Sequence, residues 1–411
     1  MAEPGQVKIG SRSTDELPTK LDSLTGLRFF AALLVFLFHT GLSVNPIHLT
    51  GPSISPFADD TVAFWYGWIF STGGFVGVSF FFVLSGFVLA WSSRPDSSAR
   101  AFIRRRVVKV FPNHVVMWAL AMLLFAGAAT WQVWLPNLFL LHSWFPDLQV
   151  SQSINMPSWS LACELLFYLC FPLLIRPISR MTVRQLWFGA AAMVVGLALY
   201  QLAIATVVPG QPNMGWAVLS NLQYWLSYLF PVGRIFEFVF GVFLARIVLS
   251  GKWVRISPLA ATAIMVLGYA ATLFVPVQFA INLVTLVPIG VMVASFADAD
   301  VRGARTGLRS RLLVWFGNIS FGFYMCQAVT IFYLRTVTGS GKFSTPVAVL
   351  VLLGLFAVTL FGGWCLYRFV EMPMMRRWSR KRTAPPYEHG TDLRPRAVGE
   401  HADITRFDGR S

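Results

Sequence analysis

The feature that most constrains this 411-residue chain is a succession of apolar runs, most of them close to twenty residues long. A helix needs roughly 20 mostly apolar residues to cross the hydrocarbon core of a bilayer. Hydrophobic residues make up 56% of the chain and charged residues only 12%, and a soluble core could not bury that much apolar surface. We therefore predict an all-α, polytopic membrane helical bundle with about ten transmembrane helices. The predicted spans lie near residues 24–43, 64–91, 111–129, 159–175, 186–208, 224–245, 258–275, 279–297, 312–334 and 346–368.

A shorter apolar stretch, residues 131–145, departs from this pattern. Pro136 interrupts it, and a proline inside a helix removes a hydrogen bond and clashes with the preceding turn. We interpret the stretch as an interfacial or re-entrant segment, with a helical hairpin as the alternative.

The distribution of lysine and arginine predicts the orientation. The loops 44–63, 146–158, 209–223 and 276–278 contain neither residue, and each loop between them carries a basic cluster. Basic loops face the cytoplasm in most membrane proteins, so we expect a multi-pass protein of the cell (plasma) membrane with both termini cytoplasmic. The net charge of +15 then reflects contact with the lipid bilayer, and no nucleic-acid partner is expected.

This pattern divides the chain into three parts. Residues 1–20 are predicted to form a polar cytoplasmic tail and residues 21–378 the transmembrane domain. Residues 379–411 are polar and rich in proline and arginine, which predicts a disordered basic cytoplasmic tail.

Ionisable residues inside the predicted spans are few, and each is a functional candidate because its burial in lipid is costly. Arg28 and His39 are eleven residues apart, which places them on one face of a helix, roughly 16 Å apart along its axis. One interpretation is that Arg28 reaches the interface and His39 is a hydrogen-bonded interfacial histidine. The other is a polar track through the bundle in which His39 is a general base.

Glu164 lies about two turns inside its predicted span, at a depth comparable with that of His39. It is either a structural carboxylate paired with Arg234 or His39, or a catalytic group that orients the base or binds a substrate hydroxyl. Arg234 and Glu237 are three residues apart and can pair on one helix face. A structural ion pair is the favoured interpretation for those two, with substrate binding beside Arg28 as the alternative.

A basic cluster in the first cytoplasmic loop contains Arg104, Arg105, Arg106 and Lys109. Positive-inside bias alone explains such a cluster, but its density also suits a polyphosphate ligand. No Walker-type loop or dinucleotide fingerprint is present, which disfavours nucleotide hydrolysis. The four cysteines lie in apolar stretches without metal-ligand spacing, so no metal site is expected.

Several segments, in order along the chain, resemble the blocks of the membrane acyltransferase-3 family. They are LDSLTGLRFFAALLVFLFHT, GGFVGVSFFFVLSGFVLA, RRRVVKVFP, PSWSLACELLFY, GRIFEFVFGVFLA, FGNISFGFYMCQ and YRFVEMPMMRR, between about residues 21 and 378. The resemblance implies ten helices and transfer of an acyl group from acyl-coenzyme A to a hydroxyl group, often on a sugar. On this basis acyl-coenzyme A is expected as a co-substrate, and no permanently bound cofactor is expected.

The same resemblance assigns roles to single residues. The family's Arg-x10-His pair corresponds to Arg28 and His39, and its Trp-Ser-Leu block contributes Glu164. Its Arg-x-x-Arg motif corresponds to Arg106 and Lys109, where lysine offers charge without a bidentate fork. Where the family commonly has histidine in a late block, this chain has Gln327, which cannot carry a proton in the same way.

Within this family, the sequence resembles members that acylate sugar-bearing natural products such as macrolides. The expected partners are therefore acyl-coenzyme A, a hydroxyl-bearing sugar or glycosylated natural product such as an antibiotic, and the lipid bilayer.

The residues alone leave two other classes of protein open. A secondary transporter would also carry intramembrane arginine, glutamate and histidine, although no internal repeat is evident, and a non-catalytic membrane sensor or scaffold is the third possibility.

Overall fold

The computed structural model describes residues 18, 20–47, 53–93, 98–214 and 217–378. Within these ranges the chain is helical, and the β pairing consists of two isolated bridges, Phe57 with Phe343 and Asn213 with Ser220. The helices are α1 Asp22–Thr40, α2 Asp60–Phe70, α3 Gly73–Trp91, α4 Ala99–Ala121, α5 Trp131–Leu138, α6 Leu148–Ser151, α7 Trp159–Ser179, α8 Val183–Val207, α9 Asn221–Tyr224, α10 Ile235–Leu249, α11 Pro258–Thr272, α12 Val277–Ala280, α13 Leu283–Val301, α14 Arg311–Gln327, α15 Leu334–Val337, α16 Thr345–Cys365 and α17 Met372–Trp378.

The predicted all-α polytopic bundle is confirmed. Eight helical segments in the described part of the chain are long and apolar enough to cross a membrane. The other two of the ten predicted runs contain α10 and α11, which are 15 residues long each. The run before α10 is broken because Phe230 is extended, between a π-helical turn at Trp225–Leu229 and a 3-10 turn at Pro231–Arg234. The two predicted polar tails lie almost entirely outside the described residues.

The stretch 131–145 forms short, broken elements, although Pro136 itself lies within α5 and the break follows it. Helix α5 ends at Leu138, Leu140 has a positive φ of 57°, and a 3-10 turn follows at His142–Trp144. An eight-residue helix is only about 12 Å long, so this stretch does not form the helical hairpin considered as an alternative. Buried polar groups hold it against the bundle: Nε2 of His114 lies 3.0 Å from the carbonyl oxygen of Asn137.

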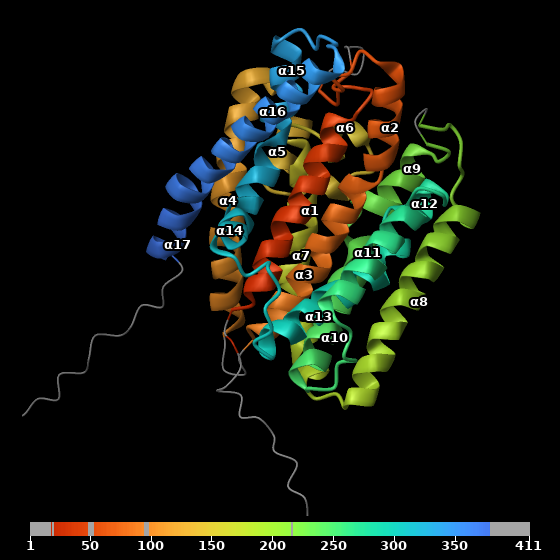
Figure 1. Ribbon diagram of the computed structural model, residues 1–411, viewed down its shortest axis with the longest axis vertical. Helices are drawn as coiled ribbons and strands as arrows, with labels where there is room; N and C mark the ends of the chain where they lie inside the picture. The colour runs from red at the N-terminus through yellow and green to blue at the C-terminus, as the bar shows by residue number, and fades with distance from the viewer. Residues whose placement is uncertain (1–17, 19, 48–52, 94–97, 215–216, 379–411) are drawn as a thin grey trace, which may run out of the picture. The chain divides into compact units, whose positions relative to one another are not determined.

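Helix α1 runs between α3 and α14, and its close packing against both depends on glycine (Figure 1). A Cβ atom at Gly317 of α14 would collide with the carbonyl oxygen of Thr25, and one at Gly77 of α3 with the carbonyl oxygen of Ala31. Small residues let transmembrane helices approach at backbone distance, where van der Waals contact is greatest. The sequence thereby brings three helices close together around the positively charged Arg28.

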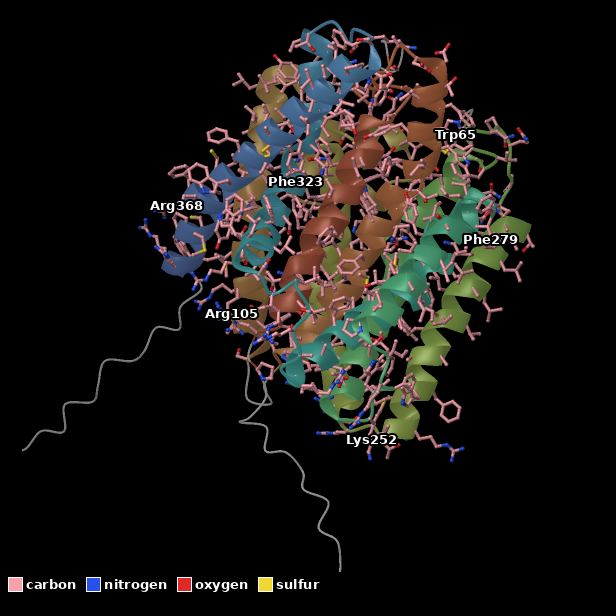
Figure 2. The ribbon with its side chains drawn as sticks, in the orientation of Figure 1. Trp65, Arg105, Lys252, Phe279, Phe323 and Arg368 are labelled. Atoms are coloured by element: carbon pink, nitrogen blue, oxygen red, sulfur yellow. The ribbon has the colours of Figure 1, made fainter. Side chains whose placement is uncertain are left out.

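An aromatic cluster fixes α1 against α14 and α16. The rings of Phe29 and Phe316 stack with centroids 4.5 Å apart, and Phe323 lies 5.7 Å from Phe356. Phe323 is fully buried and occupies the interior of the bundle (Figure 2). Burial of such rings stabilises the helix contacts and fixes the rotation of α1 about its axis.

The beginning of α1 is held by a carboxylate from α13. Both carboxylate oxygens of Asp300 accept hydrogen bonds from Ser23, one from its backbone N–H at 2.9 Å and one from its hydroxyl at 2.6 Å. An acidic group at a helix N-terminus satisfies an otherwise unpaired N–H donor.

Arg105 and Lys252 lie in the lower half of the view and Trp65 in the upper half (Figure 2). These two basic residues therefore lie toward the same end of the bundle.

Candidate active site

A cavity of about 110 Å³ opens between α1, α3, α4, α7, α14 and the π-helical turn Leu366–Glu371. It combines apolar walls with a group of ionisable side chains. The charged or phenolic residues that line it are Arg28, Arg106, Lys109, Glu164, Tyr168, Tyr324 and Glu371. Four of these, Arg28, Arg106, Lys109 and Glu164, are site residues that the sequence predicts, and the fold brings them together from three different helices.

The charges in this cavity are not neutralised by direct contact. Among the described residues, no salt bridge within 4.0 Å involves any of these side chains. Electrostatic interactions nevertheless link Arg28 to Arg106, Glu164 and Glu371. The buried Nε of Arg106 has no hydrogen-bond partner. Since an unpaired buried charge is costly, a cavity that is lined by three cations and two carboxylates without a direct ion pair suits a polar, net anionic ligand.

The two carboxylates have neutral partners. The hydroxyl of Tyr168 donates to Oε2 of Glu164 at 2.6 Å, one helical turn along α7. The amide of Asn113 donates to Oε2 of Glu371 at 3.4 Å. Neither carboxylate pairs with Arg234, so the structural pairing of Glu164 with Arg234 is not formed. These hydrogen bonds restrain the carboxylates at the cavity wall, and neither carboxylate forms a salt bridge with one of the three cations.

The basic cluster divides between cavity and surface. Arg106 and Lys109 are three residues apart on α4 and both line the cavity, whereas Arg104 is exposed and Arg105 half-buried, and neither contributes to the lining. Side chains three apart share a helix face, which explains why these two point the same way. The proposed phosphate contacts of Arg104 and Arg105 therefore stay predictions for a ligand that extends out of the cavity.

His39 lies outside this cavity, in different surroundings. It is buried near the end of α1, with an exposed fraction of 4%. Its Nδ1 atom lies 2.6 Å from Oε1 of Gln327. The ring of Phe332 meets it edge-on at a centroid distance of 5.1 Å, and that of Phe38 lies at 5.4 Å. The contact to the imidazole considered for Glu164 is thus made by Gln327 instead.

The cavity nevertheless extends toward His39 along α14. Its lining on that helix begins at Gly317 and ends at Tyr324, and Gln327 follows three residues later. Three residues correspond to about 4.5 Å of helix axis. The hydroxyl of Tyr324 contacts that of Ser160 at 3.0 Å, and Phe81 packs against the tyrosine ring. Tyr324 and Phe81 therefore close the end of the cavity that is nearest the Gln327–His39 pair.

Arg234 and Glu237 form a pair of their own. The Nε of Arg234 lies 3.0 Å from Oε2 of Glu237, both side chains are fully buried, and Arg234 also donates to the hydroxyl of Ser79. The guanidinium lies over the rings of Phe82 and Tyr228. Neither member of the pair lines the cavity, and this geometry matches the structural ion pair that the sequence favours. Their role as substrate-binding residues stays a prediction.

Three residues at or beside the site are not among those that the sequence predicts. Glu371 lies beyond the last apolar run, so it does not count as an intramembrane acid. Tyr168 is four residues after Glu164, and this i,i+4 spacing is a signal that could identify it. Gln327 stands out in the sequence only by its inability to carry a proton, and its hydrogen bond across to α1 has no sequence signal.

Comparisons with known proteins show the class to which the chain belongs. The acyltransferase domain model of the acyltransferase-3 family matches residues 21–368. The chain belongs to this family. Acyltransferase MdmB of Streptomyces mycarofaciens is 36% identical over 399 residues, which cover 92% of this chain and 97% of that protein. Nodulation protein 10 of Rhizobium leguminosarum bv. viciae is 25% identical over 236 residues, or 51% and 58% of the two chains. No solved structure matches. The protein is therefore a multi-pass membrane enzyme that transfers acyl groups.

Proposed function

We propose that this enzyme transfers an acyl group from acyl-coenzyme A to a hydroxyl of a sugar-containing acceptor, with His39 as the general base. The observation that carries the proposal is a cavity that is lined by three cations without a salt bridge, Arg28, Arg106 and Lys109. Its lining on α14 ends at Tyr324, three residues before the Gln327 that contacts His39. A negatively charged donor bound at one end then directs its reactive group toward the base at the other.

The donor is assigned to the cavity by its charge. Phosphate groups are matched by arginine forks and by lysine, so the phosphates of coenzyme A are placed on Arg106 and Lys109, with Arg104 and Arg105 outside the cavity as further contacts. The pantetheine arm enters past Arg28. This arrangement assigns the donor to the cytoplasmic face, because these basic residues belong to a loop predicted to be cytoplasmic.

In the proposed reaction the acceptor hydroxyl lies at His39, and the acyl transfer takes place in the following steps. His39 removes the proton from the acceptor hydroxyl as the oxygen attacks the thioester carbonyl. A carbon–oxygen bond forms and the carbon–sulfur bond breaks. The proton then passes from the imidazole to the departing thiolate, which leaves as free coenzyme A. Glu164 and Glu371 are placed to accept hydrogen bonds from the donor's amide groups or from the acceptor.

The acceptor class is inferred from the family resemblance. A glycosylated natural product of the macrolide type is the proposed acceptor, with a cell-surface glycan as the alternative. Mass spectrometry of extracts from a deletion strain tests this: the expected result is one product that lacks a single acyl mass. Unchanged glycans and secondary metabolites would contradict the proposal.

The role of His39 is tested with membranes from the deletion strain that carry a plasmid-borne enzyme. These membranes are supplied with radiolabelled acetyl-, propionyl- or butyryl-coenzyme A and an extract of the deletion strain as acceptor. We expect His39→Ala to lower labelled product by at least about 100-fold, the typical minimum contribution of a general base. A His39→Ala enzyme that is inserted, folded and fully active would overturn the assignment.

A further inference from the structure

A buried amide, not a carboxylate, contacts the imidazole of His39. Gln327 is the last residue of α14, is fully buried, and lies directly before the π-helical turn Ala328–Tyr333. Its side chain lies between two atoms of α1. Oε1 is 2.6 Å from Nδ1 of His39, and Nε2 donates to the carbonyl oxygen of Ala32 at 3.4 Å. The amide therefore bridges two turns of the same helix.

The second contact determines which way the amide points. A carbonyl oxygen only accepts hydrogen bonds, so the group that faces Ala32 must be the NH₂ of Gln327. The amide oxygen is then the atom that faces His39. Because an amide oxygen has no proton to give, the hydrogen bond to Nδ1 requires that Nδ1 carries the proton and donates it.

This arrangement leaves the other imidazole nitrogen as the basic one. With the proton on Nδ1, a neutral ring has its lone pair on Nε2. Nε2 has no hydrogen-bond partner among the described residues. No carboxylate of the described chain forms a hydrogen bond or ion pair with the ring.

We infer that Gln327 is a positioning residue that holds His39 in the Nδ1-protonated tautomer, with Nε2 as the atom that accepts the proton of the acceptor hydroxyl. In the enzymes where a histidine acts as base, a partner on the second nitrogen commonly selects the tautomer and the ring orientation. Here that partner is a neutral amide, and the aromatic rings of Phe38 and Phe332 also restrict the orientation of the imidazole.

Substitution of Gln327 separates positioning from packing. Gln327→Met keeps the length and burial of the side chain but removes the acceptor, and Gln327→Glu keeps an oxygen toward Nδ1. With the same membrane assay, we expect Gln327→Met to lower kcat by about 100-fold with little change in the donor KM. We expect Gln327→Glu to stay within about tenfold of wild type. Its carboxylate favours the protonated imidazole, so the acidic limb of its pH–activity profile moves to higher pH.

Gln201→Leu is the matched control. Gln201 is also a fully buried glutamine and donates to Asn282 at 2.9 Å, away from His39. Its substitution is expected to lower thermal stability and the amount of folded enzyme without lowering kcat of the enzyme that remains folded. A Gln201→Leu enzyme that shows the same fall in kcat as Gln327→Met at an unchanged donor KM would overturn the inference, because loss of buried amide packing would then explain that fall.

Nitrogen-15 NMR of histidine-labelled enzyme in lipid nanodiscs gives a second, activity-free measurement. The signals of His39 are assigned by their absence from His39→Ala. We expect the protonated nitrogen to be Nδ1 in the wild type and the tautomers to mix in Gln327→Met. An Nε2-protonated ring in the wild type would contradict the inference.

The role of Gln327 rests on the proposed use of His39, and the outcomes tell the two apart. An active His39→Ala enzyme removes the proposed function itself. An inactive His39→Ala enzyme together with a fully active Gln327→Met enzyme, or a Gln327→Glu enzyme as impaired as Gln327→Met, removes only the positioning role.

Discussion

The cavity at Arg28 and the surroundings of His39 lie along the same two helices, α1 and α14, but their polar groups differ in kind. The cavity gathers three cations and two carboxylates without a direct ion pair. His39 contacts one neutral amide and two aromatic rings. Charge suits recognition of an anionic donor, whereas a neutral partner keeps a base free to accept a proton. In the proposed function, the donor binds in the cavity and proton transfer takes place at His39.

The largest effect expected from this comparison is in the cavity. Arg106→Glu changes its lining from three cations and two carboxylates to two cations and three carboxylates. Because the carboxylates would then repel the donor phosphates, we expect kcat/KM for acyl-coenzyme A to fall by at least about 100-fold, which is about 2.7 kcal/mol, mainly through KM. Initial rates at varied donor concentration measure this change.

Arg100→Glu provides the matched control, since Arg100 lies on the same helix but is exposed, does not line the cavity and has no proposed contact with the donor. Its kcat/KM should stay within about threefold of wild type at moderate salt, where exposed charges are screened. Equal losses for the two variants would mean that the net charge of the first turns of α4, and not the cavity, recognises the donor.

A buried pair outside the cavity should affect stability rather than binding. Glu237→Gln leaves the fully buried guanidinium of Arg234 without its carboxylate. Breaking a buried ion pair by removal of one partner costs about 3–5 kcal/mol. We expect a large decrease in thermal stability in detergent, while the donor KM of the enzyme that remains folded is unchanged. A raised donor KM at wild-type stability would instead assign Arg234 and Glu237 to the substrate.

A single hydrogen bond in the cavity should have a moderate effect. Tyr168→Phe removes the donor to Glu164 but keeps the ring in place. A hydrogen bond to a charged group contributes about 1.5–3 kcal/mol, so we expect kcat/KM to fall by about tenfold or more. Tyr200→Phe is the control, because its hydroxyl donates to the carbonyl oxygen of Leu226, away from the cavity. A cavity that does not use Glu164 would show no difference between the two variants.

The same contrast explains which parts of the site are predictable from sequence. Charged residues in apolar runs are conspicuous, so hydropathy alone is enough to select Arg28, Glu164 and His39 as candidates. The position of Arg106 and Lys109 beside Arg28 and Glu164 depends on how α4 packs against α7 and α14. Hydropathy contains no information on that packing. Gln327 gives no charge signal, and Glu371 follows the end of its apolar run. Glu371 lines the cavity from a π-helical turn, and such a turn has no signal in the hydropathy pattern.

The smallest expected effect concerns Lys109, where the family motif has arginine. Lys109→Arg keeps the charge and adds a planar group that can form two parallel hydrogen bonds with a phosphate. If this position contacts the donor phosphates, the longer fork should lower the donor KM by about twofold to fivefold and leave kcat unchanged. Lys252→Arg, at a basic position outside the cavity lining, should change neither constant. The alternative is that Lys109 only compensates the negative charge of Glu164 and Glu371, its electrostatic partners of opposite sign. In that case the substitution will not change the donor KM, and the phosphates would have to bind closer to Arg106.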